Sequence, residues 1–591
     1  MKILLAACNA KYIHSNLAVY DLKAYSSDYD EHVILREYTI NQPKDEILKD
    51  IYSSGADVVC FSCYIWNISF VRELIRDLVK ILPKTAFWAG GPEVSYDAEK
   101  FLTEMPEMTG VMVGEGEKTF HDLLEFYIDG KDSLEEISGI AYRTGDKIIH
   151  NGWRELMDLS AIPFVYEHLE KFENRIIYYE SSRGCPFSCS YCLSSIDKKL
   201  RFRDLELVKK ELQFFLDHRV PQVKFVDRTF NCKHEHAMTI WKYILEHDNG
   251  VTNFHFEISA DLLREEEMEL MSQMRPGLIQ LEIGVQSTNP ETIRAIHRHM
   301  DLKKLEHCVN RVHSFRNIHQ HLDLIAGLPY EDYDSFGRSF DEIYELKPNQ
   351  LQLGFLKVLK GSYMFEHAAE YGIVYHDKPP YEVMSTKWLS FDDVIKIKRV
   401  EDMLEVYYNS GQFEITMKLM ECIFDSAFEF FQELGDFYEA NGYFGMSHSR
   451  IRRCEILLEF LALYLHGCDS DAITSVGLSE NDGDRDNTDF DENAQIYSMI
   501  QESLIFDLYY RENCKSRPVW ATDIGKFKHM THAYCKNGKL SHVEPFHYIF
   551  PDKHTRKLDE LPKYHKEPVW ALFHYDMRDP LDHQALVEYI E

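Results

Sequence analysis

The segment Glu180–Cys192 carries three cysteines in a C-x3-C-x2-C spacing, a pattern with which one loop can bring three thiolates to one inorganic centre. The cysteines are Cys185, Cys189 and Cys192. They follow the β-branched and aromatic run 176–179, which predicts a strand. A structural zinc site needs a fourth protein ligand, and the nearest candidates, Cys232 and His234, are poorly spaced for it. Three ligands without a fourth suit an iron–sulfur cubane with one open iron, and zinc or metal-free thiols are the alternatives.

Six candidate strands with helical segments between them follow from Arg175 to about Val358. This alternation predicts a partial (β/α)6 barrel of the TIM type, with its site at the carboxyl ends of the strands. The cysteine loop follows the first strand, and polar residues fall at or near the ends of the next four strands: Asp227, Glu257, Asp261, Glu282, Gln286 and Asp323. Each alone is compatible with a satisfied core group or a helix cap, but together they favour a site.

Residues 1 to about 130 also alternate short apolar runs with helical patterns, which predicts an α/β domain with a doubly wound, Rossmann-like (flavodoxin-like) parallel sheet. Ligands of such sheets bind over the carboxyl ends of the strands. Candidate ligand-binding residues gather in the loops after four strands: Tyr12, His14, Ser15; Ser62, Tyr64, Trp66, Asn67; Gly90, Gly91, Pro92, Glu93; and Gly114, Glu115, Gly116. We expect the glycines to let the backbone approach a bulky ligand.

The cysteine loop after a first strand resembles the signature of the radical S-adenosylmethionine (SAM) enzymes. In that family three cysteines hold a 4Fe–4S cluster, the open iron binds SAM, and the reduced cluster cleaves SAM to a 5′-deoxyadenosyl radical. Tyr191 fits the family's aromatic residue before the last cysteine, and the segments around the later strand ends resemble the family's second to fifth motifs. The resemblance implies SAM contacts from five residues: Tyr191, Asp227, Glu257, Glu282 and Gln286.

The pair of motifs G-G-P-E at 90–93 and V-G-E-G-E at 113–117 resembles the cobalamin-binding domain that precedes one large radical SAM subclass. A Rossmann-like domain for another ligand, or a vestigial one, is the alternative. The D-x-H-x-x-G pattern, whose histidine binds cobalt from below, is not present in this loop. The resemblance therefore implies a base-off cobalamin whose lower face meets a non-ligating side chain, with Trp66, Tyr64 or Asn67 as candidates.

Four parts of the chain are predicted: a cobalamin-binding domain at 1–135, a hairpin and linker at 136–174, the barrel at 175–360, and a mostly helical C-terminal domain at 375–591. The hairpin pattern at 139–150 is expected to lead from the first domain to the second. In the C-terminal part, apolar residues at helical spacing precede aromatic and β-branched runs that indicate a small β element near the end. This part resembles a family-specific domain of unknown role.

Composition limits the partners and the compartment. The formal net charge of −33 argues against sequence-independent nucleic-acid binding. The first apolar run, 3–8, is too short for a signal peptide or a membrane span. Thirteen cysteines without a signal segment indicate reduced thiols and a cytoplasmic location.

The leading hypothesis is a cobalamin-dependent radical SAM enzyme that methylates an unactivated carbon of a small molecule or peptide. The resemblance also implies an electron donor such as flavodoxin or ferredoxin. Cyclisation, ring contraction or oxidation without methyl transfer are alternatives in the same class. A transfer-RNA methylthiotransferase would use a second cysteine trio, for which Cys8, Cys60 and Cys63 are candidates, and a cobalamin or redox sensor is the non-enzymatic alternative.

Overall fold

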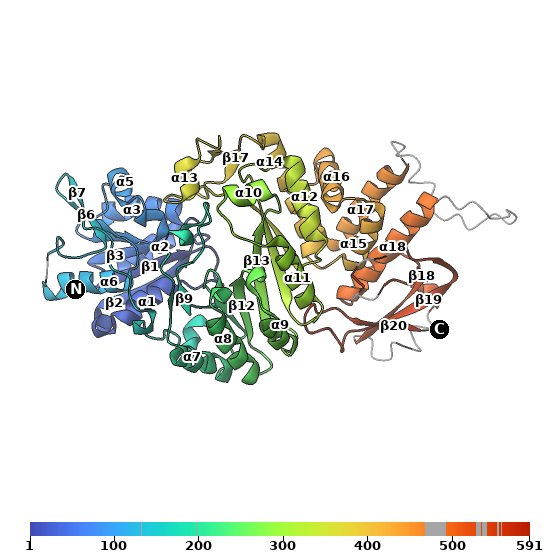
Figure 1. The fold of residues 1–591 in the computed structure, drawn as a ribbon, viewed down its shortest axis with the longest axis horizontal. Helices are drawn as coiled ribbons and strands as arrows, with labels where there is room; N and C mark the ends of the chain where they lie inside the picture. Colours follow the sequence, from blue (N-terminus) through green and yellow to red (C-terminus); the bar gives the residue numbers. More distant parts are fainter. Residues whose placement is uncertain are drawn as a thin grey trace. The chain divides into compact units, whose positions relative to one another are not determined.

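The computed structural model describes residues 1–590 except 132, 197, 467–491, 528–533, 535–539, 552–554, 557 and 559. The chain divides into two compact units (Figure 1). The first contains Met1–Gln320, Ile325–Asp332 and Gly354–Ser390, and the second contains His321–Leu324, Tyr333–Leu353 and Phe391–Glu591.

A seven-stranded sheet forms the N-terminal part of the first unit. Its parallel strands are β1 Ile3–Asn9, β2 Val33–Thr39, β3 Val58–Ser62, β4 Ala86–Gly90 and β5 Gly110–Met112. The order β2-β1-β3-β4-β5 is that of flavodoxin-like sheets, in which ligands bind where the order reverses beside β1 and β3. The hairpin of β6 Ile140–Thr144 and β7 Lys147–His150 pairs antiparallel with β5. It therefore extends the first sheet, and the expectation that it leads to the second domain stays a prediction.

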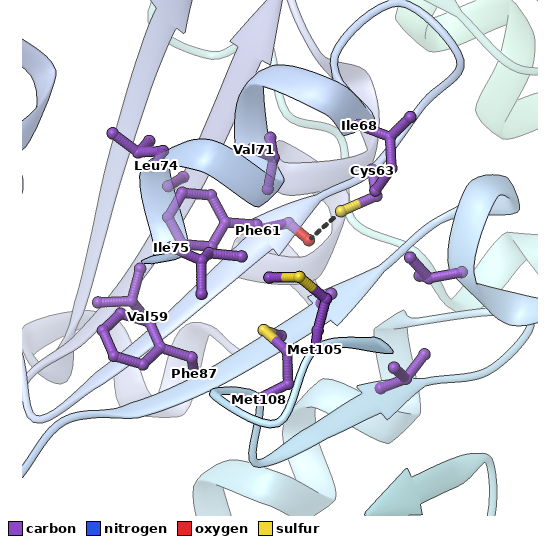
Figure 2. Packing of buried hydrophobic residues seen from close by; sticks show 14 of the residues in the cluster. Val59, Phe61, Cys63, Ile68, Val71, Leu74, Ile75, Phe87, Met105 and Met108 are labelled. Atoms are coloured by element: carbon purple, nitrogen blue, oxygen red, sulfur yellow. Dashed lines mark hydrogen bonds between the residues drawn. The ribbon is translucent and has the colours of Figure 1, made fainter. Parts of the chain in front are cut away.

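Helices cover both faces of this sheet, because its strands are apolar on both sides. One face packs on α2 Lys44–Ser54, α3 Ile68–Ile81 and α5 Ala98–Glu104, and the other on α1 Leu17–Tyr25 and α6 Glu117–Leu124. Helix α3 shows the cause: Val71, Leu74, Ile75 and Leu78 recur at helical spacing and are fully buried, so one stripe faces the sheet (Figure 2).

A second, six-stranded sheet has the order β15-β14-β13-β12-β11-β8 and agrees with the predicted partial barrel. Its strands are β8 Ile177–Tyr179, β11 Gln222–Phe225, β12 Asn253–Ile258, β13 Ile279–Gln286, β14 His319–Ala326 and β15 Gln350–Phe355. The helices between them are α7 Leu205–Asp217, α8 His234–Glu246, α9 Glu265–Ser272, α10 Pro290–Ala295, α11 Leu302–His313 and α12 Tyr333–Tyr344. Strands β14 and β15 have residues in both units.

Strand β13 shows how this sheet presents polar groups. Its apolar residues are buried at every second position, while Glu282, Gly284 and Gln286 alternate with them. Because successive side chains of a strand point to opposite faces, these three residues share one face. One face of the strand therefore packs in the core, and the other face carries the polar side chains of Glu282 and Gln286.

After β15 the chain forms α13 Tyr363–His367, β16 Val374–Tyr375 and β17 Val383–Ser385 within the first unit. The second unit contains α14 Phe391–Leu404, α15 Glu414–Ile423, α16 Ala427–Ala440, α17 Arg450–His466 and α18 Glu492–Arg511. A three-stranded antiparallel sheet follows, with β18 Ser541–Tyr548, β19 Tyr564–His574 and β20 Leu586–Ile590. The mostly helical C-terminal part with a late β element is therefore confirmed.

Leu74 tests the packing of the first sheet. Leu74→Ala should lower the free energy of unfolding by about 2–5 kcal/mol, because it removes buried methyl groups and leaves a cavity. Ile81→Ala in the same helix is the matched control, since Ile81 is 47% exposed and should cost less than about 1 kcal/mol. Urea denaturation followed by circular dichroism measures both. Equal losses would contradict the packing of α3.

Candidate functional site

The cysteine loop is closed by a short antiparallel pair, β9 Ser182–Arg183 and β10 Arg201–Phe202. Gly184 begins the loop with φ +94°, a conformation that favours glycine. Cys185 and Cys189 are buried, and Cys192 is partly exposed. The loop thus holds three thiols at the end of the first barrel strand, as the spacing predicted.

The spacing of the thiols distinguishes a cluster from a single ion. Tetrahedral zinc with Zn–S bonds of about 2.3 Å holds its sulfurs roughly 4 Å apart. Among the described residues, the groups of three or more ligand atoms that lie within 4.8 Å of one another do not include these cysteines. The three thiols therefore do not all lie within 4.8 Å of one another, which is wider than one zinc ion requires, and the cubane stays the prediction.

Arg298 is a residue that sequence reasoning missed. The Nη1 atom of Arg298 lies 3.9 Å from Cys189 Sγ and 3.3 Å from Tyr191 Oη. The Nη2 atom donates to the Gly284 carbonyl. Burial raises the pKa of Cys189, and the Arg298 charge acts in the opposite direction. A buried guanidinium beside the thiols favours the thiolates that a cluster needs.

Gln286 lies close to this group. Its backbone φ is +77°, and a side chain at position 284 would come within 2.4 Å of its amide nitrogen. The Oε1 atom of Gln286 is buried without a hydrogen-bond partner in the described part of the chain. A buried amide oxygen without a partner is costly in an isolated chain, so it marks a place for a polar ligand.

Glu282 is an ionised and paired carboxylate. Lys224 donates to it at 3.0 Å, and His255 Nε2 lies 2.9 Å from it. Burial acts to raise its pKa, but the His255 hydrogen bond and the Lys224 charge lower the pKa to about 2. Glu257, on the neighbouring strand β12, lies 4.0 Å from Arg228. Both carboxylates stay predicted SAM contacts.

Asp227 is accounted for by contacts within the chain. It is fully buried and accepts hydrogen bonds from Ser181 N at 2.9 Å, Ser181 Oγ at 2.7 Å and Ser182 Oγ at 2.6 Å. Burial raises its pKa to about 6, against the effect of these hydrogen bonds. The structure therefore gives Asp227 a clear positioning role, because it holds the backbone that leads into the cysteine loop.

Two adjoining cavities lie over the carboxyl ends of the first sheet. The first has a volume of about 540 Å³, and the predicted residues that line it are Ser62, Tyr64, Gly90, Gly91, Pro92, Gly114, Glu115 and Gly116. The second has about 870 Å³, and the predicted residues that line it are His14, Ser15, Tyr64, Trp66, Pro92 and Glu93, with Tyr191 and Cys192. The second cavity therefore joins the sheet loops to the cysteine loop.

Tyr12 and Asn67 have other contacts. Tyr12 is exposed, and the guanidinium carbon of Arg175 lies over its ring, 4.8 Å from the centre of the Tyr12 ring. Asn67 is fully buried and donates to the carbonyls of Cys8 and Ser62 at 3.0 and 2.9 Å. Asn67 thus shapes the loop after β3 from inside.

Gly91 is required by a close contact within the chain. Its φ is +109°, and a Cβ atom would lie 2.5 Å from the carbonyl oxygen of Cys63. The close approach that demands glycine is therefore between two loops of the chain. The expectation that glycine here also lets the backbone approach a ligand stays a prediction, and Gly91 does line the first cavity.

His14 and Trp66 lie on the second cavity. His14 Nδ1 is 2.7 Å from the hydroxyl of Tyr178, and burial lowers the pKa of His14. The Trp66 ring stacks on Tyr64 with centroids 4.4 Å apart and planes 7° apart. Tyr178 therefore engages one His14 ring nitrogen, and the cavity presents an extended aromatic face.

Cys8, Cys60 and Cys63 do not form a second trio. All three are buried, but Cys8 and Cys63 belong to the apolar cluster on one face of the sheet and Cys60 to the cluster on the other. Cys63 Sγ lies 3.8 Å from the Phe61 carbonyl within the first cluster (Figure 2). Burial raises the pKa of Cys8 and of Cys60 to about 12. These thiols are protonated core residues.

Arg183 joins the cysteine loop to the loop after β5. Its guanidinium nitrogens lie 2.7 Å from Glu180, 2.8 Å from Glu117 and 3.3 Å from Glu115. Arg201 also contacts Glu115, at 2.7 Å. Burial opposes the charge, but Glu180 and Glu117 raise the pKa of Arg183 well above its usual value. Arg183 lines both cavities and was not singled out from the sequence.

The chain thus combines a flavodoxin-like sheet that carries ligand loops with a barrel that carries a three-cysteine loop. Family models identify these parts: residues 3–124 match the B12 binding domain and residues 179–343 match the Radical SAM superfamily. Residues 369–584 match Protein of unknown function (DUF4080). The chain thus carries a B12-binding domain and a radical SAM domain, which confirms the predicted cofactors: cobalamin, a 4Fe–4S cluster and SAM.

Known proteins agree with this domain order. The chain is 23% identical over 309 residues to the cobalamin-dependent radical SAM methyltransferase TokK of Streptomyces tokunonensis, covering 49% of this chain and 45% of that one. It is 24% identical over 277 residues to hopanoid C-3 methylase of Methylococcus capsulatus, covering 44% and 51%. It therefore spans about half the length of these curated relatives.

A solved structure shares the fold. OxsB, a cobalamin-dependent S-adenosylmethionine radical enzyme solved with aqua-cobalamin and S-adenosylmethionine bound, matches with a TM-score of 0.55 at 15% identity. This match covers 86% of the present chain and 80% of OxsB. In the part of the chain that the structure describes, every helix is too short or too polar to cross a membrane.

Asp227 generates a prediction about the cluster. Asp227→Ala leaves the Ser181 and Ser182 donors without their acceptor, at about 1–3 kcal/mol for each buried unsatisfied group. The strand should loosen, and the purified chain should lose iron faster during anaerobic dialysis. Asp204→Ala is the control, because it removes the N-cap of α7 and costs about 1 kcal/mol. Equal iron retention in the wild type, Asp227→Ala and Asp204→Ala would contradict the positioning role of Asp227.

Proposed function

We propose that this chain is a cobalamin-dependent radical SAM enzyme that methylates an unactivated carbon. The observation that carries the proposal is the common wall of the two cavities. Six residues line both: Ala18, Tyr64, Pro92, Tyr96, Glu117 and Arg183. Tyr191 and Cys192 of the cysteine loop line the second cavity. A ligand over the first sheet would thus face the loop that holds the cluster.

The chain's own residues have three tasks in this proposal. The cysteines Cys185, Cys189 and Cys192 would hold the cluster, with Arg298 balancing their charge. Gln286, with its unpartnered amide oxygen, is suited to a polar group of SAM. When bound, the cluster and SAM supply a 5′-deoxyadenosyl radical that abstracts a substrate hydrogen, and cobalamin supplies the methyl group that the carbon radical takes.

The loops of the first sheet would bind cobalamin. The first cavity is suited to its nucleotide tail, because it extends along the glycine loops after β4 and β5. The second is suited to the corrin, because the stacked rings of Tyr64 and Trp66 offer a flat apolar wall. Such a wall excludes water from the lower face and presents no ligating atom.

The substrate and the reductant belong to the proposal as classes. We propose a small molecule or peptide as substrate and a flavodoxin or ferredoxin as electron donor. The net charge of −33 disfavours nucleic acid. The location of Cys8, Cys60 and Cys63 in two apolar clusters also disfavours the transfer-RNA methylthiotransferase, which would require a second cysteine trio.

Cysteine substitution tests the proposed function. Replacing Cys185, Cys189 or Cys192 with Ala should abolish iron binding and the reductive cleavage of SAM, because two thiolates do not hold a cubane. Anaerobic iron and sulfide analysis and detection of 5′-deoxyadenosine measure the two effects. Cys232→Ala is the matched control and should retain both. A loop variant that keeps four irons and still forms 5′-deoxyadenosine would refute the assignment.

The lower face of cobalt provides a second test. We expect no protein nitrogen on cobalt, because the loop after β1 lacks the D-x-H-x-x-G pattern and Trp66 offers no ligating atom. Electron paramagnetic resonance of the Co(II) form should therefore lack the triplet splitting that an axial nitrogen produces. His14→Ala should leave the spectrum unchanged. Triplets in the wild type that vanish in His14→Ala would make His14 a ligand and overturn this expectation.

A further inference from the structure

The segment 356–383, here called the clasp, follows the last barrel strand and turns back on itself. Val358 N donates to the Tyr381 carbonyl at 3.0 Å, and Val383 N donates to the Leu356 carbonyl at 2.8 Å. The two ends of the clasp thus lie side by side, within the first unit. Its second half falls in the region that matches the family of unknown function.

One end of the clasp binds the loop after β4. The Tyr381 hydroxyl donates to Glu93 Oε2 at 2.8 Å, and both residues are buried. Burial raises the pKa of Glu93, against the effect of this hydrogen bond. Lys360, from the first half of the clasp, makes a cation–π contact with the Tyr381 ring, with Nζ 5.5 Å from the ring centre. Glu93 follows the two glycines of the first cavity.

The same loop is contacted a second time. Gly361 has φ +83°, and a Cβ atom there would lie 2.7 Å from the ring of Tyr96. Tyr96 lines both cavities, and its ring centre lies 5.6 Å from that of Trp153. Gly361 therefore lets the clasp pack closely against Tyr96, an aromatic residue that lines both cavities.

The middle of the clasp binds the cysteine loop. Met364 N, in α13, donates to the carbonyl of Ser190 at 2.8 Å. Ser190 stands between Cys189 and Cys192, and its own N–H donates to the Ile296 carbonyl at 2.9 Å. The ring of Tyr363 lies on His297, with centroids 4.6 Å apart, next to Arg298. The clasp thus touches the cluster loop and a neighbour of the arginine that faces Cys189.

We propose that the clasp sets the position of the cobalamin loop, residues 90–96, relative to the cysteine loop, and that Tyr381 and Gly361 are positioning residues for cobalamin. This proposal rests on the proposed function, since it takes the two cavities as the cobalamin site. It gives part of the region of unknown function a role. Neither residue is proposed to react, because both act through Glu93 and Tyr96.

The test measures cobalamin affinity of the reconstituted full-length chain by equilibrium dialysis with hydroxocobalamin, with iron content as the check on folding. Tyr381→Phe should raise the cobalamin Kd about tenfold, equivalent to about 1.4 kcal/mol. Iron content should stay at the wild-type value. In a double-mutant cycle with Glu93→Ala, the combined variant should bind no more weakly than the weaker single variant, because both remove one interaction.

Two matched controls separate the contacts from general damage. Tyr375→Phe removes a hydroxyl from β16 of the same segment and should bind cobalamin like the wild type. Gly361→Ala should weaken cobalamin binding, whereas Gly372→Ala should not. Both glycines have positive φ, but the nearest atom to a Cβ at 372 is in the flexible Lys387 side chain. The backbone strain is therefore common to both variants.

A wild-type chain that binds no cobalamin overturns the proposed function. If the wild type binds cobalamin and Tyr381→Phe and Gly361→Ala bind it equally well, the clasp proposal alone fails. It also fails if the effects of Tyr381→Phe and Glu93→Ala are additive, or if Gly372→Ala weakens binding as much as Gly361→Ala does.

Discussion

The guanidinium of Arg183 joins the two halves of the candidate site. It stands two residues before Cys185 and is shared by Glu180 of its own loop and by Glu115 and Glu117 of the loop after β5. A buried arginine is tolerated only when its charge is balanced. The arginine in turn stabilises the negative charges of the three carboxylates. Removing Arg183 would leave three carboxylates beside the single positive charge of Arg201. The cysteine loop and the glycine loop are thus coupled by electrostatics.

Burial controls the remaining charges around this group. Asp21 lies on the second cavity, and its pKa is raised well above the usual value, first by burial and then by Glu117 and Glu180. Burial therefore disfavours a fourth negative charge on this wall. Arg201 supplies a second cation to Glu115. The wall of the cavities is close to electrical balance, which suits an organic ligand of modest charge more than a free metal ion.

Sequence reasoning predicted what local patterns determine. Apolar periodicity located the strands and helices, and the alternation of the two predicted a parallel sheet in each domain. The three cysteines were predicted because their spacing is itself the geometry of one loop. Cys60 and Cys63 differ by three positions, which on a strand implies opposite faces, and the structure places them in the two separate clusters. The close approach of Gly91 to Cys63 was not predicted, because Cys63 belongs to another loop.

The residues that sequence reasoning missed act across long separations. Arg298 reaches Cys189 from 109 positions away, and Tyr381 reaches Glu93 from 288 positions away. No periodicity or spacing marks such a residue in a single sequence, since its partner is chosen by the fold. The first segment of the region of unknown function contacts the B12-binding domain through the hydrogen bond from Tyr381 to Glu93. A domain boundary drawn from sequence at the end of the barrel would therefore separate Tyr381 from the loop it supports.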